Sequence, residues 1–473
     1  MDAWIKRGDA DLCDGGWGEV RMRAVSEGRA IFPPAPRAPQ EGASARGIAR
    51  ALGENALLAF PPEAFEEEVL IRNFFGRRQV ILSRPASIHH ILVDNPANYR
   101  RTPATIRMLR PLLGNGLLLS EGEDWRHQRQ TVASAFTPRT IPLLARHIAQ
   151  ATGALIDGLV DCRGHPVDLL AEMQFLALEI AGRSMFSLAM DRHGAELREL
   201  VSGYAEHLGR PSLLDFLLPL PIPSPREFAR RRFRRRWMAL IGRLIAERRE
   251  TAPEGTPGDL FDLLANEERD PNRLADQFAT LITAGHETTA VALFWALYLV
   301  AATPEVGERI AAEAALLDLG PDGAAEALSR LVYTRAVVQE ALRLYPPAFT
   351  LARLARRADT AGGIPIPARA VVLIAPWVLH RHRRLWDQPE RFDPSRFLPG
   401  APPPERCAYL PFGMGPRVCI GAQFALSEAT LVLAAMIQAF QIERAYSEPV
   451  TPVAIVTTQP DHPPLFRFAP RRQ

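Results

Sequence analysis

The sequence predicts a mainly α-helical fold with a small β subdomain, organised as one large domain. Over residues 85–345, apolar residues recur at the helical period between breaks made by proline and glycine. Two stretches, 65–85 and 364–376, are instead rich in β-branched and apolar residues in short runs. No internal repeat and no glycine- or serine-rich linker divides the chain. We therefore predict an N-terminal arm over 1–45 and a single domain over 46–473, although 473 residues would suit about three domains of ordinary size.

In chain order, each element follows from a local signal. The arm lacks a helical period and contains IFPPAPRAP, which indicates extended backbone. In VLIRNFFGRRQVILS, two β-rich runs flank Gly76 and predict a hairpin. SEGE, from Ser120 to Glu123, matches a capping box ahead of the helix that begins WRHQRQ. The C-terminal part is predicted to contain short strands over 364–376, an irregular stretch over 386–418 and a last helix over about 420–440.

Composition argues against several classes of enzyme. The chain has 56 Lys and Arg against 53 Asp and Glu, and Lys6, in the arm, is its single lysine. P-loop enzymes, protein kinases and Schiff-base enzymes each need a positioned lysine. The four cysteines form no CxxC pair and no disulfide framework, which fits a reduced compartment. The N-terminus also lacks the order of a signal peptide, and no basic stripe with interleaved aromatics is present. We therefore expect a cytoplasmic protein that binds no nucleic acid.

The strongest functional signal is the segment PFGMGPRVCIG at 411–421. Its matching residues form the haem-binding signature of the cytochrome P450 superfamily, which the chain resembles: Phe412, Gly413, Gly415, Arg417, Cys419 and Gly421. Glycines let the backbone turn tightly enough for amide N–H groups to face a sulfur atom. A thiolate ligand pushes electron density onto haem iron, and a following helix is expected to lower the pKa of the thiol. The alternative, a buried structural cysteine, would not need three glycines and an arginine beside it.

The resemblance covers roughly residues 60–465 and implies the cytochrome P450 fold, with a long central helix over the haem. It implies haem b, iron protoporphyrin IX, as the cofactor and Cys419 as the axial ligand of its iron. Phe412 would pack beside the sulfur, Arg417 would bind a haem propionate, and Gly413 and Gly421 would shape the loop around the cofactor.

A second signal is the apolar stretch FATLITAGHETTAVALFWALYLVAA at 278–302. Charged and polar residues in its middle exclude a membrane span and favour a helix that crosses a large core. AGHETT resembles the oxygen-binding motif of the same superfamily. Ala284 and Gly285 would allow close approach of a flat cofactor, and the Thr288 hydroxyl is placed to bond the carbonyl of Ala284. By resemblance, Thr288 supports oxygen activation and Glu287 relays protons from solvent.

A third signal is the pair Glu340 and Arg343 in VVQEALRLYPP, three residues apart on one helix face. An exposed pair at this spacing would be ordinary. In the family such a pair is closed by an arginine from a downstream segment, which matches Arg396 in FDPSRF. Because buried charges must be paired, we interpret Glu340, Arg343 and Arg396 as structural support for the cysteine loop and not as catalytic residues.

Further residues match cofactor and substrate positions of the family. In DWRHQRQ, Trp125 and Arg129 match an element whose indole and guanidinium meet the propionates, and Arg353 occupies another propionate position. A surface role is the ordinary alternative for any one arginine. Phe349 and Leu351, with Ala284 and Thr288, are predicted to line an apolar substrate pocket.

The resemblance implies a bacterial-type haem-thiolate monooxygenase that inserts one oxygen atom from O2 into an apolar C–H bond or alkene. A lipid- or terpenoid-like substrate is favoured. Electrons would come from NAD(P)H through a separate partner, a ferredoxin or flavodoxin with its reductase. Two alternatives stay open: a haem-thiolate enzyme that uses or rearranges peroxides, and a non-enzymatic haem sensor or carrier.

The stretch LLDFLLPLPIP at 213–223 precedes an arginine-rich helix at 226–236. One interpretation is a substrate-access lid that touches a membrane surface. We favour the other, a lid packed on its own helices with a solvated basic face, so membrane contact is expected to be absent or peripheral.

Overall fold

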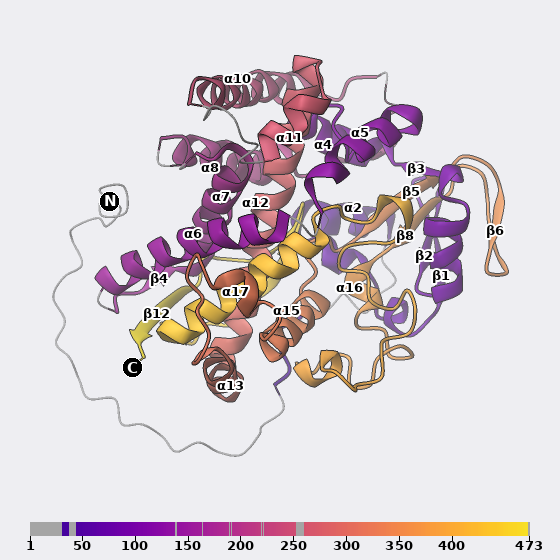
Figure 1. The fold of residues 1–473 in the computed structure, drawn as a ribbon. Coiled ribbons are helices and arrows are strands. Elements are labelled where there is room, and N and C mark those ends of the chain that lie inside the picture. Colours follow the sequence, from indigo (N-terminus) through magenta and orange to yellow (C-terminus); the bar gives the residue numbers. More distant parts are fainter. Residues whose placement is uncertain are drawn as a thin grey trace.

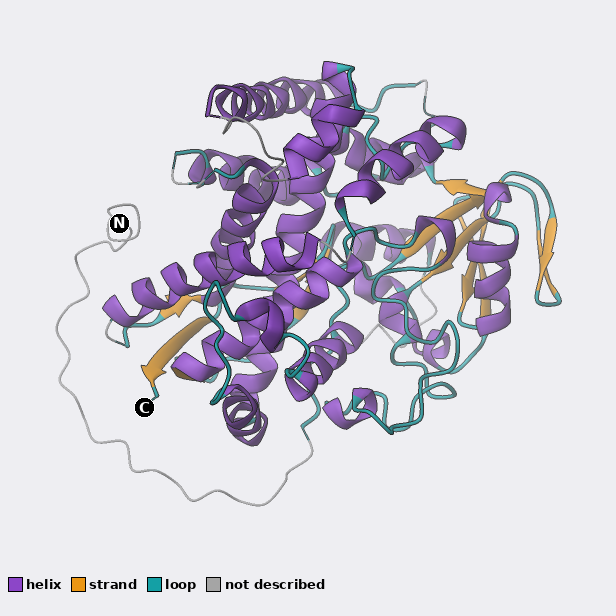
Figure 2. Cartoon of the chain, in the orientation of Figure 1, coloured by secondary structure: helices purple, strands orange, loops and turns teal. Residues whose placement is uncertain are grey.

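Helices form one side of the molecule and a twisted sheet forms the other (Figures 1 and 2). The computed structural model describes residues 31–36, 44–137, 140–162, 164–188, 190, 192–218, 220, 222–251 and 260–471. The mainly helical fold with small sheets, predicted from the sequence, is confirmed.

The helices carry the labels of Figure 1. They are α2 (Ala45–Glu54), α3 (Pro85–His89), α4 (Pro103–Leu113), α5 (Gly122–Ala135), α6 (Ile141–Asp161), α7 (Leu169–Phe186), α8 (Gly194–Gly203), α9 (Leu213–Leu217), α10 (Glu227–Thr251), α11 (Leu260–Glu267), α12 (Pro271–Ala302), α13 (Pro304–Ala314), α14 (Ala324–Ala327), α15 (Val332–Leu344), α16 (Pro376–Leu379) and α17 (Ala422–Ala439).

The strands form four small sheets. They are β1 (Val69–Phe74), β2 (Arg77–Leu82), β3 (Tyr99–Arg101), β4 (Val167–Asp168), β5 (Leu351–Ala355), β6 (Asp359–Ala361), β7 (Ile364–Ile366), β8 (Val371–Ile374), β9 (Phe440–Arg444), β10 (Pro452–Ala454), β11 (Thr458–Pro460) and β12 (Leu465–Pro470).

The central element is α12, which runs unbroken from Pro271 to Ala302. Asp270 caps its N-terminus by accepting a hydrogen bond from the Asn272 N–H, and Pro271 suits the first turn. Its C-terminal half is apolar on every side and buried, as expected for a helix surrounded by core. It packs against α7, α15 and α17, so its middle lies where the helical layers meet.

The main sheet has the strand order β1-β2-β8-β5-β3. The predicted hairpin is confirmed: β1 and β2 are antiparallel, joined by Phe75 and Gly76 with φ of +47° and +77°. Such a turn matches the twist of the strands it joins. β3 pairs with β5 at the edge, and its register sets Arg101 opposite Arg353. That register determines which side chains reach the site described below.

The C-terminal elements agree with the sequence: β7 and β8 lie within 364–376, and α17 covers most of 420–440. The predicted capping box is wrong. The helix begins inside the predicted box, at Gly122 with Glu121 as the N-cap residue, and the Ser120 hydroxyl bonds the Gln128 side chain at 3.2 Å instead of capping.

The first thirty residues of the predicted arm lie outside the described residues. Part of the arm that is described, residues 31–36, rests on the helical core. The carbonyl of Ile31 accepts from the Phe392 N–H at 3.1 Å, and that of Pro34 from the Tyr345 hydroxyl at 2.9 Å.

Candidate active site

The cysteine loop, residues 412–421, leads directly into α17. Its backbone turns through Gly413 and Gly415, whose φ angles are +70° and +76°. A Cβ at Gly415 would lie 2.0 Å from the carbonyl oxygen of Leu92, so only glycine fits there. The N–H of Cys419 donates to the carbonyl of Phe412 at 2.9 Å and closes the loop. The sequence therefore builds a tight turn that presents one thiol.

Cys419 is exposed, whereas Cys407 is buried and Cys162 is half-buried. Desolvation raises the pKa of the Cys419 thiol, although the Gly421 N–H and the Arg129 guanidinium act in the lowering direction. The prediction of a lowered pKa is thus wrong for the protein chain itself, because desolvation outweighs the start of α17. The thiol is nevertheless reachable and faces two groups that favour a thiolate.

Three arginines meet beside the loop: Arg417 from the loop itself, Arg353 from β5 and Arg101 from β3. Burial, together with the neighbouring guanidiniums, lowers the pKa of Arg101 to about 9 and that of Arg353 to about 10. Arg417 pairs with Glu121 at 2.7 Å, yet its buried Nη1 and the buried Nε of Arg101 have no hydrogen-bond partner within the described structure. Such a cluster needs more negative charge than one carboxylate supplies.

Arg101 is a site residue that sequence reasoning missed. It stands in a run of two arginines on a three-residue strand, and nothing in the local pattern distinguishes it from a surface residue. Its position depends on the pairing of β3 with β5, which are about 250 residues apart in sequence. Arg101 could have been identified only from the register of β3 on β5, which the sequence does not show.

Trp125 and Arg129, both on α5, lie beside the cysteine loop, and their predicted contact with the haem propionates stays a prediction. The Arg129 Nη1 donates to the carbonyl of Val418 at 2.8 Å, next to Cys419. The Arg417 guanidinium lies over the Trp125 ring in a cation–π contact, with its central carbon 4.5 Å from the ring centroid. α5 therefore braces the loop from one side.

On α12, the stretch from Ala284 to Thr288 contains solvent-accessible positions in a helix that is otherwise mostly buried. Ala284 is exposed, and Gly285 and Thr288 are partly exposed, while the helix on either side is covered. The Thr288 hydroxyl donates to the Ala284 carbonyl at 2.5 Å, as predicted. Small residues and one hydroxyl thus form an accessible strip in the middle of the core.

Glu287, the residue before Thr288 on α12, is buried. Its carboxylate accepts hydrogen bonds from the Gln459 amide, from the Thr457 hydroxyl at 3.3 Å and from the Gln174 amide at 3.4 Å. The neighbouring His286 is fully buried, and desolvation lowers its pKa. The sequence did not predict Gln459, Thr457 or Gln174 as partners, because they come from distant elements.

Glu340, Arg343 and Arg396 are brought together as predicted. Arg343 donates Nε and Nη2 to the two carboxylate oxygens of Glu340 at 2.7 and 2.8 Å, and both side chains are fully buried. The Arg396 Nε lies 3.6 Å from Glu340. Arg343 also donates to carbonyls of the segment that precedes the cysteine loop, those of His380, Pro389 and Arg391.

His380 is a second residue that sequence reasoning missed. Its Nε2 accepts from the N–H of Leu410 at 2.8 Å, so the neutral ring places its proton on Nδ1, which lies 3.1 Å from the Arg343 carbonyl. The ring therefore links the end of α15 to the chain just before the cysteine loop. Burial and the nearby Arg343 lower the pKa of His380 to about 3.

This depressed pKa predicts acid sensitivity. In the unfolded chain the imidazole takes up a proton near pH 6.5, whereas the folded protein resists it down to about pH 3. Stability is therefore complete above pH 6.5 and falls below it, by up to about 1.4 kcal/mol per pH unit. Urea unfolding between pH 6.5 and 5 should show a shallower slope for His380→Gln than for the wild type. Equal slopes would mean that His380 is not the responsible group.

The two residues predicted to line the substrate pocket differ in surroundings. Phe349 is buried in the core cluster that contains Tyr345 and Trp377. The Leu351 side chain lies beside Gly413, 4.0 Å from where a Cβ would stand. Their role as pocket lining stays a prediction.

These residues fit a flat, dianionic iron porphyrin. Cys419 offers one exposed thiol as an axial ligand, and the under-neutralised guanidiniums of Arg101, Arg353 and Arg417 suit two carboxylates. The accessible strip at Ala284 and Gly285 is free of bulky side chains.

Comparisons with known proteins agree with this arrangement. The sequence pattern of the cytochrome P450 family matches residues 67–462. Cyclooctat-9-en-7-ol 5-monooxygenase of Streptomyces melanosporofaciens is 35% identical over 338 residues, 69% of this chain and 72% of the relative. Cyclooctatin synthase of the same organism is 34% identical over 381 residues, 78% of this chain and 81% of the relative. A cytokinin hydroxylase of Arabidopsis thaliana is 32% identical over 376 residues, 74% of this chain and 71% of the relative. With its thiol loop, its arginine cluster and a family match across most of its length, the chain belongs to the cytochrome P450 family and is a haem-thiolate monooxygenase.

Proposed function

We propose that this monooxygenase inserts one oxygen atom from O2 into a C–H bond or alkene of an apolar, lipid- or terpenoid-like substrate. The observation that carries the proposal is the accessible strip of α12, where the Thr288 hydroxyl is held on the Ala284 carbonyl and Glu287 lies one residue away. An alcohol and an acid side by side on one helix suit the delivery of protons to a reaction that reduces oxygen.

The roles of the side chains follow from their positions. The haem supplies the iron that activates oxygen with electrons from outside. Cys419 would hold the iron, and Arg101, Arg353 and Arg417 would hold the propionates. Thr288 donates or passes a proton at its Oγ1. Glu287, held by Gln459, Thr457 and Gln174, is the neighbouring acid that would supply protons to that hydroxyl.

Two observations support an apolar substrate. The accessible positions Ala284 and Gly285 carry no polar side chain. One relative acts, by its name, on cyclooctat-9-en-7-ol, an unsaturated alcohol, and another on cytokinins. A screen of terpenoids and fatty acids for the low-spin to high-spin shift of the haem spectrum would identify the compound class.

For electron delivery we propose a separate ferredoxin or flavodoxin, with its reductase and NAD(P)H, in the cytoplasm. The docking face would be that of the cysteine loop, where Arg126 on α5 is exposed and pairs only at the surface, with Glu123 at 3.1 Å. We also propose that residues 46–473 act as one catalytic domain.

The Thr288→Ala variant tests this proposal. It removes the hydroxyl but preserves the helix, so the Ala284 carbonyl keeps its ordinary backbone partner. We expect oxygen consumption with ferredoxin, reductase and NAD(P)H to continue while product formation falls roughly 10- to 100-fold, as expected for the loss of a proton donor. Product and hydrogen peroxide would be measured in the same reaction, with Thr289→Ala as the matched control.

The two alternatives predict other outcomes. A peroxide-using enzyme would turn over faster with hydrogen peroxide than with the ferredoxin system, and its rate would not depend on Thr288. A haem sensor or carrier would form no product with any electron donor. Equal product formation by wild type and Thr288→Ala would overturn the role assigned to the hydroxyl.

A further inference from the structure

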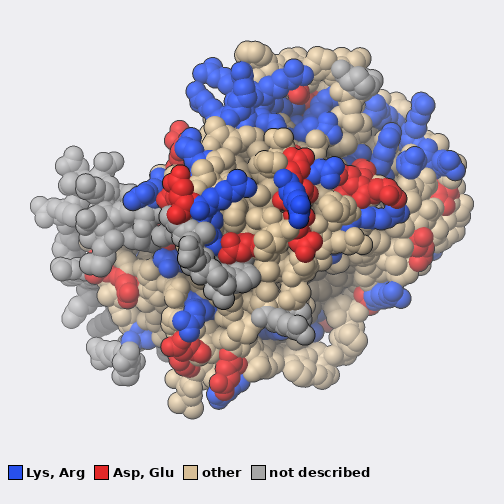
Figure 3. All heavy atoms as spheres, turned by 45° about the horizontal axis from the view of Figure 1, so that its top comes forward, with Lys and Arg blue, Asp and Glu red and all other residues tan. Residues whose placement is uncertain are grey.

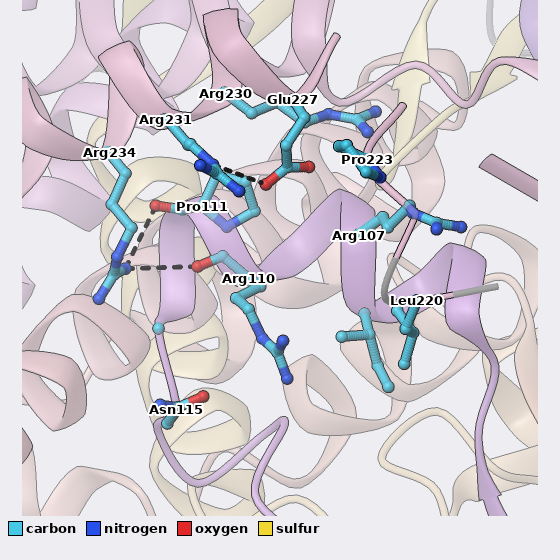
Figure 4. Close-up of a pocket in the computed structure, with 12 residues that line it drawn as sticks. Arg107, Arg110, Pro111, Asn115, Leu220, Pro223, Glu227, Arg230, Arg231 and Arg234 are labelled. Atoms are coloured by element: carbon cyan, nitrogen blue, oxygen red, sulfur yellow. Dashed lines mark hydrogen bonds and ion pairs between the residues drawn. The ribbon is translucent and has the colours of Figure 1, made fainter. Parts of the chain in front are cut away.

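The arginines beside α10 and the carboxylate of Asp359 on β6 differ in where their partners lie. Lys and Arg side chains gather in the upper part of Figure 3, and α10 lies at the top of Figure 1. In the pocket between α4 and α10 (Figure 4), Arg231 pairs with Glu227 at 3.5 Å and Arg234 pairs with Asp276 at 2.7 Å. One oxygen atom of Asp359 instead accepts hydrogen bonds from three side chains that are 260 to 269 residues away in the chain.

Asp359 is the first residue of the hairpin formed by β6 and β7, and Figure 1 shows β6 at the outer edge of the molecule. Its Oδ2 accepts from the His90 Nε2 at 3.0 Å, the Asn95 amide at 3.0 Å and the Tyr99 hydroxyl at 2.8 Å. Desolvation acts to raise the pKa of Asp359, but its hydrogen bonds outweigh this effect and lower the pKa to about 2. The acceptor is therefore charged at neutral pH, which strengthens each of the three bonds.

His90 and Asn95 mark the two ends of an unusual turn. Residues His90–Asp94 form a single π turn, in which the Asn95 N–H donates to the His90 carbonyl at 2.8 Å. Such turns are rare and are frequently found at functional sites. Because the side chains at both ends of the turn bond the same oxygen atom, Asp359 fixes the position of the whole turn.

The π turn lies directly against the cysteine loop. The carbonyl oxygen of Leu92 would lie 2.0 Å from a Cβ at Gly415, and the Cα of Val93 would lie 3.5 Å from the same point. Gly415 stands four residues before Cys419. The side chains of Leu92 and Met414 also belong to one apolar cluster. A shift of the π turn would therefore move the backbone that presents the thiol, since close-packed contacts transmit strain.

The third donor, Tyr99, belongs to β3, the strand that carries Arg101. Tyr99 is buried and lies two residues before Arg101 in this three-residue strand. The bond from its hydroxyl joins β3 to the same oxygen atom that holds the π turn. Asp359 thus links the support of the cysteine loop to a strand that supplies an arginine of the candidate haem site.

The hairpin that carries Asp359 is itself anchored to α3, the helix that leads into the π turn. The Arg84 Nη1 donates to the carbonyl of Gly362, and the Ser87 hydroxyl donates to the carbonyl of Ala361, both at 2.9 Å. A Cβ at Gly362 would lie 2.7 Å from the Ser87 Oγ, so the hairpin turn is packed closely on α3. The carboxylate is therefore presented from an anchored hairpin.

We propose that Asp359 is a positioning residue for the haem site: by holding the π turn and β3 on one oxygen atom, it sets the Cys419 thiol relative to the Arg101 guanidinium. Groups behind the direct ligands of a metal commonly orient those ligands and tune the metal. The proposal rests on the assignment of Cys419 as the iron ligand. The competing explanation is that apolar packing alone positions the loop, in which case the carboxylate would contribute only to stability.

Asp359→Ala in the haem-loaded protein tests the proposal, with Glu313→Ala as the matched control. Glu313 on α13 is also a half-buried carboxylate that accepts three hydrogen bonds from another element, from the N–H groups of Tyr333 and Thr334 and from the Thr334 hydroxyl. Both variants should therefore lose comparable stability to urea.

Only Asp359→Ala should also change the haem site. We expect it to release haem to apomyoglobin roughly tenfold faster than the wild type. Part of the red-shifted Soret band of the CO-bound ferrous protein should be lost. The reduction potential should rise, because a thiolate that binds iron less well donates less electron density.

Three further variants separate the two arms of this carboxylate. His90→Leu removes one bond to the π turn and should weaken the red-shifted band. Tyr99→Phe removes only the hydroxyl that holds β3, so it should speed haem release and leave the band in place. Asp359→Asn keeps an oxygen acceptor at the same position and should lie between the wild type and Asp359→Ala.

The proposal is overturned if Asp359→Ala keeps the wild-type band, potential and rate of haem release. It is equally overturned if Glu313→Ala changes them to the same extent, because the effect would then be one of general stability. If Asp359→Ala does not fold, an unchanged band in His90→Leu overturns it. A wild-type protein without the red-shifted band would refute the assignment of Cys419 itself, and the proposal with it.

Discussion

Replacement of Cys419 by serine is expected to abolish substrate oxidation and the red-shifted Soret band of the CO-bound ferrous protein. A serine hydroxyl fits the loop, because the turn depends on Gly413 and Gly415 and on the backbone bond from Cys419 to Phe412. What is lost is the thiolate, which alone supplies the electron density that favours O–O cleavage. Because the arginine cluster is unchanged in this variant, haem content, absorbance spectra and product formation should be measured on the same samples.

The matched control is Cys162→Ser. Cys162 is half-buried at the end of α6, and its sulfur donates only to the Gly158 carbonyl at 3.4 Å. Its variant should retain both the band and the activity. Persistence of the red-shifted band in Cys419→Ser would show that another group holds the iron.

Replacement of Arg343 by methionine is expected to destabilise the protein by about 3–5 kcal/mol, the cost of leaving a buried charge without its partner. Without the guanidinium, the Glu340 carboxylate and the carbonyls of His380, Pro389 and Arg391 would lose the hydrogen bonds that Arg343 donates to them. Burial already raises the pKa of Glu340, and Arg343 is the main group opposing that rise. Urea unfolding and haem content would measure the effect.

Two further variants separate the buried pair from a general effect of charge. Arg335→Met removes an exposed arginine of the same helix and should change stability by less than about 0.5 kcal/mol. The double variant Glu340→Gln, Arg343→Met removes both charges and should be more stable than Arg343→Met alone. If Arg343→Met unfolds at the same urea concentration as the wild type, the structural role of this ion pair is contradicted.

The site could be predicted from sequence where its residues stand close together in the chain. The cysteine loop and the Ala284–Thr288 strip are such segments, because their geometry follows from glycine turns and from helical spacing. Glu340 and Arg343 also share one helix turn. Arg396 could be placed only through resemblance, since it comes from a different segment.

The residues that were missed all depend on long-range packing. Arg101 reaches the site through the register of β3 on β5, and His380 through a bond from α16 to Leu410. Gln459 reaches Glu287 from β11.

The pairing of β3 with β5 has a consequence for how the protein assembles. β3 is a three-residue strand at the edge of its sheet, and it places one arginine directly across from another. Like charges facing each other weaken a strand pair, and a short edge strand has little else to hold it. Carboxylates arriving between the two guanidiniums would reverse that repulsion. Binding of the haem propionates would therefore stabilise this edge of the sheet as well as hold the cofactor.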